Sequence, residues 1–227
     1  MSNRPDRAAR RWAPPRLYAI LDVDLADARG LDPVTVADIW LAEGVRLIQL
    51  RAKQLSFGPM TELASVLALR ARASAATFIV NDRADVAALA GADGVHVGQD
   101  DLSPADVRPL LGANSIVGLS THTAAQLTAA LDSPVDYVAM GPVHVTTTKA
   151  RTDPVVGLEG VRQAAALAAR ASLPLVAIGG LSVDRAATVL DAGAQSLAVA
   201  SGLLDPDPRT AARRWLDAVG LQAPRPR

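Results

Sequence analysis

The sequence predicts an α/β protein, a (β/α)8 TIM barrel, from three observations. Short runs of Val, Ile and Leu alternate with longer Ala- and Leu-rich stretches that have the 3.6-residue spacing of helices. The alternation repeats eight times in 227 residues, close to the length that such a barrel needs. The short connections require parallel strands joined by right-handed crossovers. An open doubly wound sheet is the alternative, but no glycine-rich turn follows the first strand at Asp22.

The predicted strands are short, branched and apolar, as expected for strands buried on both faces. They are Leu17–Asp22, Leu47–Arg51, Thr77–Asn81, Gly94–Val97, Ile116–Leu119, Tyr137–Met140, Leu175–Ile178 and Ser196–Ala200. The predicted helices are Pro33–Ala42, Pro59–Arg72, Arg83–Ala90, Pro104–Leu111, Ala124–Leu131, Leu158–Arg170, Val183–Ala192 and Pro208–Val219. Suitable caps precede three helices (Ser103, Thr123, Ser182), and glycines follow three (Gly91, Gly112, Gly193).

Residues 17–220 are predicted to form one catalytic barrel domain. The arginine-rich residues 1–16 are expected to be a frayed or disordered arm, and residues 221–227 a tail whose prolines cannot continue a helix. The apolar runs are too short for a signal peptide or for a membrane helix of about 18 residues. We therefore expect a cytoplasmic protein without a membrane partner. The oligomeric state stays open, a homodimer included.

Composition excludes several function classes. Lys plus Arg and Asp plus Glu both total 23, and this zero net charge argues against a nucleic-acid partner. The absence of cysteine excludes disulfides, cysteine-ligated metals and a thiol nucleophile. Aromatic residues make up only 3%, too few for stacked platforms that bind bases or sugars. No Gly-x-Ser-x-Gly elbow or His-Glu-x-x-His pattern is present either.

Polar residues should gather where the strands end, because TIM barrels carry their sites at that face. Period-two alternation in the second strand puts Gln49, Arg51 and Lys53 on the side of the barrel axis. Buried cations need anionic partners. A salt bridge to Asp22 or Asp82 would supply one, but two cations at i and i+2 fit a polyanionic ligand better.

Carboxylates follow the third and fourth strands, at Asp82 and at Asp100 and Asp101. Such groups could hold Mg²⁺, which takes oxygen ligands from one or two carboxylates and substrate phosphates. A salt bridge to the neighbouring cations is an equally good reading of the spacing. Asp82 could also cap the helix that begins at Arg83, and the other two could serve the turn before Ser103.

The loops after strands six, seven and eight carry candidate phosphate-binding groups. Gly179-Gly180 and Ala200-Ser201-Gly202 stand at the last two strands, where such barrels frequently bind phosphate through backbone N–H groups. The sixth loop contains three threonines and a lysine, Thr146 to Lys149, which could grip an anion or form an ordinary solvated loop. His96 lies inside a strand and is predicted to be a hydrogen-bonded core residue.

The order and spacing of several motifs over residues 17–204 resemble the thiamine phosphate synthase family, also called thiamine-phosphate pyrophosphorylase. The motifs are Gln49-Leu50-Arg51-Ala52-Lys53, Asn81-Asp82-Arg83, Gly94-Val95-His96-Val97-Gly98-Gln99-Asp100-Asp101-Leu102, Gly118-Leu119-Ser120, Gly141-Pro142-Val143, Thr146-Thr147-Thr148-Lys149, Ala177-Ile178-Gly179-Gly180 and Ala200-Ser201. The family joins a hydroxymethylpyrimidine diphosphate to a thiazole phosphate, or to its carboxylated form, and releases pyrophosphate.

The resemblance implies a role for each matched position. The pyrimidine diphosphate would be held by Gln49, Arg51, Lys53, Asn81, Ser120 and Lys149. The thiazole phosphate would be held by Thr146, Thr148, Gly180, Ala200 and Ser201. Mg²⁺ would be bound by Asp82 and Asp101. Arg51, Lys53 and Lys149 would act as the catalytic cations, because the implied dissociative reaction develops negative charge on the leaving pyrophosphate.

Two departures from the family pattern concern the thiazole side. Thr147 stands where Gln is frequent, and His144 where an aromatic or aliphatic residue is common. Two alternative functions are a thiazole tautomerase of the same fold and a non-catalytic phosphate-ligand sensor. The tautomerase branch has a histidine at the position of Pro142, and retention of the rim cations and carboxylates argues against the sensor.

Overall fold

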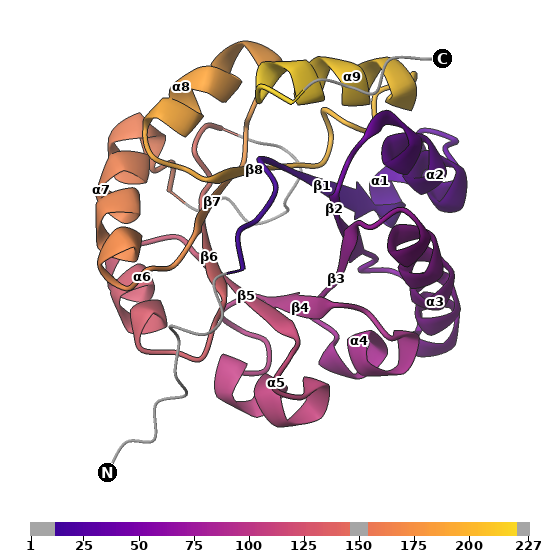
Figure 1. Cartoon of the computed structure of the whole chain (residues 1–227), viewed down its shortest axis with the longest axis horizontal. Helices are drawn as coiled ribbons and strands as arrows, with labels where there is room; N and C mark the ends of the chain where they lie inside the picture. The colour runs from indigo at the N-terminus through magenta and orange to yellow at the C-terminus, as the bar shows by residue number, and fades with distance from the viewer. Residues whose placement is uncertain (1–11, 146–153, 222–227) are drawn as a thin grey trace.

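Eight parallel strands close into one barrel in the chain order β1 to β8, with helices around the outside, as predicted (Figure 1). The computed structural model describes residues 12–145 and 154–221. The strands are β1 (Leu17–Asp22), β2 (Leu47–Arg51), β3 (Thr77–Asn81), β4 (Gly94–Val97), β5 (Ile116–Thr121), β6 (Tyr137–Met140), β7 (Leu175–Ile178) and β8 (Ser196–Val199). No helix in these described ranges has the length and apolar character needed to cross a membrane.

The helices form the outer ring that Figure 1 shows around the strands. They are α1 (Val23–Ala28), α2 (Pro33–Glu43), α3 (Phe57–Ala73), α4 (Ala84–Ala90), α5 (Pro104–Leu111), α6 (Ala124–Leu131), α7 (Gly157–Arg170), α8 (Ala186–Asp191) and α9 (Pro208–Ala218), with a short 3₁₀ turn, η2 (Val183–Arg185), before α8. The predicted helix Val183–Ala192 is therefore split in two. Helix α1 was not predicted, because its six residues are too few for a helical period to show.

Local signals account for several of the helix ends. The hydroxyls of Ser103 and Thr123 accept hydrogen bonds from the backbone N–H three residues on, both at 3.2 Å, as expected of N-caps. Ser182 stands at the N-cap position of η2, as predicted, but its hydroxyl makes no such bond. Gly91 ends α4 in the left-handed conformation, with φ +65°, which glycine adopts without steric cost.

Side chains alternate between the barrel interior and the layer under the helices, which sets the register of every strand. The buried inward-facing cluster consists of Tyr18, Ile20, Leu47, Ile79, Tyr137, Ala139, Val176 and Ala198. The larger cluster lies between strands and helices and includes Ile48, Leu50 and Phe78. The parity predicted for β2 is thus confirmed: Ile48 and Leu50 pack outward, and Gln49 and Arg51 face the axis with their inward neighbours.

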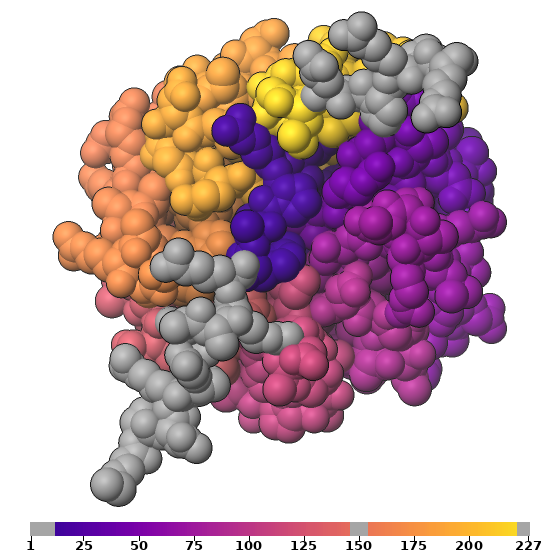
Figure 2. Space-filling view, viewed as in Figure 1, coloured from indigo at the N-terminus to yellow at the C-terminus, as the bar shows by residue number. Residues whose placement is uncertain are grey.

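The segment that enters β1 crosses one end of the barrel (Figures 1 and 2). The Trp12 ring packs against the Tyr137 ring with centroids 5.3 Å apart. The Arg16 carbonyl accepts from the Leu197 N–H at 2.9 Å, and its guanidinium donates to the Val219 carbonyl at 3.1 Å. Trp12 and Arg16 are therefore packed rather than frayed, although both belong to the arm predicted over residues 1–16; residues 1–11 lie outside the described ranges.

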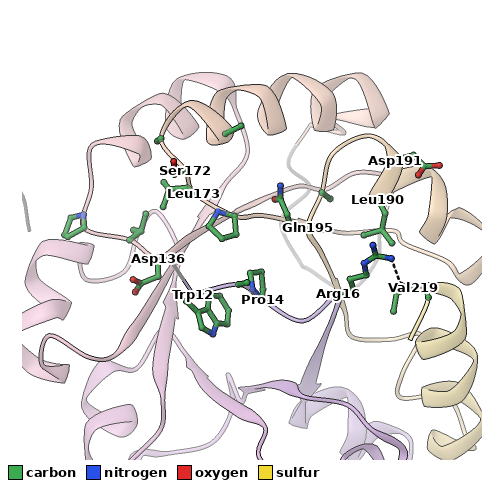
Figure 3. Close-up of a pocket in the computed structure, with 18 of the residues that line it drawn as sticks. Trp12, Pro14, Arg16, Asp136, Ser172, Leu173, Leu190, Asp191, Gln195 and Val219 are labelled. Carbon is green, nitrogen blue, oxygen red and sulfur yellow. Dashed lines mark hydrogen bonds between the residues drawn. The ribbon is translucent and has the colours of Figure 1, made fainter. Parts of the chain in front are cut away.

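A cavity of about 1590 Å³ opens at this same end, among the loops that precede β1, β6, β7 and β8 (Figure 3). Two of its polar side chains are engaged in hydrogen bonds that hold the strands. The Asp136 carboxylate accepts from Arg108 at 2.5 Å and from the Val117 N–H at 2.8 Å, and the Gln195 side-chain oxygen accepts from the Leu175 N–H at 2.6 Å. TIM-barrel active sites lie at the opposite end, where the strands have their C-terminal ends.

Candidate active site

The end of β2 meets the end of β1 through a buried ion pair. Asp22 and Arg51 are register neighbours, and the Arg51 guanidinium donates to the Asp22 carboxylate at 2.5 Å. The other Asp22 oxygen accepts from the Leu25 N–H at 3.1 Å and so caps α1. The internal salt bridge that was an alternative for Arg51 is therefore present. The Asp22 side chain is only 3% exposed, whereas that of Arg51 is 22% exposed and reaches the mouth.

Lys53, Asp82 and Asp101 form a second charged cluster at the mouth. The Lys53 ammonium forms an ion pair with the Asp82 carboxylate, which in turn lies against the Asp101 carboxylate. Burial raises the pKa of Asp82, Lys53 opposes this rise, and the neighbouring Asp101 adds to it. Asp101 also accepts from the Gly98 N–H at 2.7 Å, so the predicted turn contact exists alongside the carboxylate pair.

Asp82 is held in this position by an unusual backbone conformation. Its φ is +63°, a left-handed value that Asp and Asn tolerate better than other side chains. Its N–H donates to the His96 carbonyl at 2.7 Å. Helix α4 begins only at Ala84 and has no side-chain cap, so the alternative in which Asp82 caps this helix was wrong. The conformation instead turns the carboxylate toward Lys53.

The paired carboxylates fit a hard divalent cation. Two carboxylates in contact repel one another, and a cation between them would remove that repulsion. Within the described residues, no cluster of three or more His, Cys, Asp or Glu side chains could hold a metal. Asp82 and Asp101 would therefore supply only part of a coordination shell. This is the pattern typical of Mg²⁺, which keeps waters and takes further oxygens from substrate phosphates.

The inner wall of the mouth carries the uncharged members of the predicted site. Gln49 is buried within β2, and Asn81 and Ser120 are half-buried at the ends of β3 and β5. Ser120 is held twice: its hydroxyl lies 2.8 Å from His96 Nε2, and its carbonyl accepts from the Gln99 side chain at 2.6 Å. The prediction that His96 is a hydrogen-bonded core residue is confirmed.

Gly180, Ala200 and Ser201 follow β7 and β8, and β8 is separated from β2 by β1 alone in the closed barrel. Gly180 has φ +64°, and a Cβ there would stand 2.6 Å from the carbonyl oxygens of His144 and Val145. Only glycine fits so close to that backbone. The predicted residues Thr146, Thr148 and Lys149 lie outside the described ranges.

The sequence did not single out Tyr18 and Tyr137, which also lie inside the barrel. Their hydroxyls are 2.9 Å apart, and each reaches a residue of the mouth wall: Tyr18 accepts from Gln49 at 2.7 Å, and Tyr137 lies 2.9 Å from His96 Nδ1. The alternation along β1 and β6 could have placed both rings inside the barrel. Tyr18 is two residues from the inward-facing Ile20, and Tyr137 is two residues from the inward-facing Ala139.

This chain is similar in sequence and structure to known proteins. The family model described as thiamine monophosphate synthase matches residues 17–203. The thiamine-phosphate synthase of Koribacter versatilis is 45% identical over 210 residues, which cover 90% of this chain and 96% of the relative. That of Azorhizobium caulinodans is 42% identical over 203 residues, covering 89% and 93%.

A solved structure gives the same result. The thiamine phosphate pyrophosphorylase from Pyrococcus furiosus superposes with a TM-score of 0.80 at 31% identity, covering 90% of this chain and 95% of that one. An orotidine 5'-phosphate decarboxylase from Pyrococcus horikoshii, at 15% identity and a TM-score of 0.60, shows the shared fold alone. Sequence and structure agree, and the chain belongs to the thiamine monophosphate synthase family of enzymes.

Proposed function

We propose that this chain joins a hydroxymethylpyrimidine diphosphate to a thiazole phosphate, giving thiamine phosphate and pyrophosphate. The observation that carries the proposal is the arrangement of charge at the mouth. Two cations end β2: Arg51, which pairs with Asp22, and Lys53, which pairs with Asp82, and the Asp82 carboxylate lies against that of Asp101. A diphosphate bound with a divalent cation matches both halves of this arrangement.

The reaction replaces one bond to carbon by another. The C–O bond between the pyrimidine methylene and the diphosphate breaks and its electron pair leaves with pyrophosphate, while the lone pair of the thiazole nitrogen forms the new C–N bond. No proton has to be removed from this nucleophile, so the site needs no general base. The rate then depends on positioning and on charge that stabilises the leaving group.

The residues of the chain divide this work. Arg51 and Lys53 would face the diphosphate oxygens, where negative charge grows as the C–O bond breaks. Asp82 and Asp101 would hold Mg²⁺, which supplies further positive charge when bound. Gln49, Asn81 and Ser120 line the wall of the mouth and would orient the pyrimidine. Gly180, Ala200 and Ser201 would hold the thiazole phosphate together with Thr146 and Thr148. Lys149 would contact the diphosphate with Arg51 and Lys53.

One assay tests the function directly. Purified protein is mixed with the pyrimidine diphosphate and the thiazole phosphate, with Mg²⁺ or with EDTA, and both pyrophosphate and thiamine phosphate are measured. We expect the two products in equal amounts and only with Mg²⁺. Interconversion of thiazole isomers without pyrophosphate release would establish the tautomerase instead. Binding of either compound without any turnover would establish the phosphate-ligand sensor.

A further inference from the structure

A chain of hydrogen bonds runs through the barrel interior and joins two residues of the mouth wall. Gln49 Nε2 donates to the Tyr18 hydroxyl at 2.7 Å, and the Tyr18 and Tyr137 hydroxyls are 2.9 Å apart. The Tyr137 oxygen lies 2.9 Å from His96 Nδ1, and His96 Nε2 lies 2.8 Å from Ser120 Oγ. Gln49, Tyr18, Tyr137 and His96 are all buried, at 3%, 1%, 0% and 7% exposure. Solvent therefore does not compete for these bonds.

The contacts favour one direction for the protons in this chain of hydrogen bonds. Burial raises the pKa of both tyrosines well above the ordinary range, so each keeps its single hydroxyl proton. Tyr18 accepts from Gln49 Nε2, and the Tyr137 oxygen is the acceptor that the described residues offer to the Tyr18 proton. Tyr137 in turn gives its proton to His96 Nδ1, since the described residues offer these two hydroxyls no other acceptor.

The direction of the donors determines the tautomer of His96, and this tautomer determines whether the Ser120 hydroxyl donates or accepts. Because His96 Nδ1 accepts, a neutral imidazole carries its proton on Nε2. That N–H points at Ser120 Oγ, which becomes the acceptor of this bond. The Ser120 proton is then left over and is available to a group at the mouth. If the hydrogen bonds ran in the opposite direction, Ser120 would donate its proton to His96. It could then only accept hydrogen bonds from a ligand at the mouth.

We propose that Tyr18, Tyr137 and His96 are positioning residues that turn the Ser120 hydroxyl into a hydrogen-bond donor for the pyrimidine diphosphate. The identity of this ligand rests on the proposed function; the direction of the chain does not. The acceptors that this ligand offers to such a group are the diphosphate oxygens and the ring nitrogens. A hydroxyl already committed to donating loses less rotational freedom when the ligand binds. The same chain holds Gln49, whose Nε2 is fixed on Tyr18 and whose carbonyl oxygen is left for the ligand.

The Tyr137→Phe variant removes the link without removing the ring. Tyr137 stacks on His96 with centroids 5.4 Å apart and packs against Trp12, and phenylalanine keeps both contacts. The matched control is Thr121→Val, which also deletes a buried hydroxyl from the barrel wall. Thr121 follows Ser120 but faces the other side of β5 and donates to the Ala139 carbonyl at 2.9 Å, outside the chain.

The first measurement is ¹⁵N NMR of the full-length protein with labelled histidine, which distinguishes the two neutral tautomers. The protein contains three histidines, and a His96→Gln variant assigns the signal of His96. We expect the Nε2-protonated form of His96 in the wild type and in Thr121→Val, and a mixture of tautomers in Tyr137→Phe. A wild-type His96 protonated on Nδ1, or a tautomer unchanged in Tyr137→Phe, overturns the proposal. This result does not depend on which reaction the protein catalyses.

The second measurement is steady-state kinetics with each substrate varied in turn. We expect Tyr137→Phe to raise KM for the pyrimidine diphosphate about 3- to 10-fold, the value of one neutral hydrogen bond, and to leave KM for the thiazole phosphate unchanged. An equal change in Thr121→Val would assign the effect to barrel packing and refute the positioning role. Absence of turnover in the wild type would refute the proposed function while the NMR result still decides the direction of the chain.

Discussion

Replacing Asp82 by Asn tests the proposed metal site with little disturbance of the fold. Asn has the same shape as Asp and tolerates the left-handed backbone at this position, where φ is +63°. Alanine would add strain of about 1 kcal/mol or more to the same change and is a poorer probe. The substitution removes one charge from the Lys53–Asp82 pair and also removes the repulsion between Asp82 and Asp101.

The structure sets the expected magnitudes. The Lys53 side chain is 49% exposed, so its pair with Asp82 contributes at most about 1 kcal/mol to the free energy of unfolding. For a domain of this size, that corresponds to a change in Tm of about 2–4 °C or less. Loss of a carboxylate that holds the metal should lower turnover about 100-fold or more, equivalent to about 2.7 kcal/mol of transition-state stabilisation.

The assay compares Asp82→Asn with a matched control, Asp85→Asn. Asp85 stands three residues away and pairs with Arg83 at 2.6 Å, outside the mouth cluster. Pyrophosphate release is measured over a range of Mg²⁺ concentrations, and thermal unfolding is followed on the same samples. Turnover in Asp82→Asn equal to that of the control at limiting Mg²⁺ would refute the assignment of Asp82 as a metal ligand. A loss of turnover matched by a large loss of Tm would place the residue in the fold instead.

Three further outcomes follow from the contacts. Gly180→Ala forces a Cβ to within 2.6 Å of two carbonyl oxygens, so KM for the thiazole phosphate should rise about tenfold or more; an unchanged KM in saturation kinetics would contradict the role of this loop. Asp101→Asn should shift the Mg²⁺ requirement upward in the same assay as Asp82→Asn. Glu43→Gln should lower the free energy of unfolding at pH 7 by about 2 kcal/mol, measured by urea denaturation, because Glu43 links α2 to Arg209 and Arg213 of α9.

The Glu43 substitution also carries a prediction about pH. Hydrogen bonding to Arg213 holds the pKa of the Glu43 carboxyl below its ordinary value in the folded protein, in spite of burial. A depressed carboxyl pKa stabilises the fold above the unfolded-state pKa of about 4.3, and this contribution is lost as the pH falls through the folded-state value. The difference in unfolding free energy between wild type and Glu43→Gln should therefore shrink on acidification. A constant difference from pH 7 down to pH 3 would contradict this linkage.

The barrel could be predicted because its signals are local. In Leu47–Arg51, alternating apolar and polar side chains specify both the strand and the face that each residue occupies, and the structure confirms both. Helix α1 could not be found this way, since Val23–Ala28 is shorter than two turns and depends on a cap from Asp22. Residues that lie beyond a strand end, such as Ser182, have no periodicity to constrain them.

The choice between metal site and salt bridge could not be made from the sequence, because both uses require a carboxylate at the same strand end. Spacing along the chain does not say that Asp82 meets Lys53 and Asp101 at once. That arrangement depends on the left-handed backbone conformation of Asp82, and no neighbouring glycine in the sequence indicates a turn there. The chain from Gln49 to Ser120 was hidden for a related reason: its members come from five different strands.

The two ion pairs at the mouth differ in how easily they can be broken. The Arg51–Asp22 pair is fixed, whereas Lys53 can exchange Asp82 for another anionic partner. Asp22 is 3% exposed and is held at both oxygens, by Arg51 and by the N–H of Leu25, so moving it would leave a buried charge without a partner. Arg51 therefore keeps its direction when a ligand arrives and offers its remaining N–H groups to the diphosphate. Lys53 is 49% exposed, and hydration compensates the loss of its partner. In the proposed function, the diphosphate would take Lys53 from Asp82 and free that carboxylate for Mg²⁺, so substrate and metal binding should favour each other.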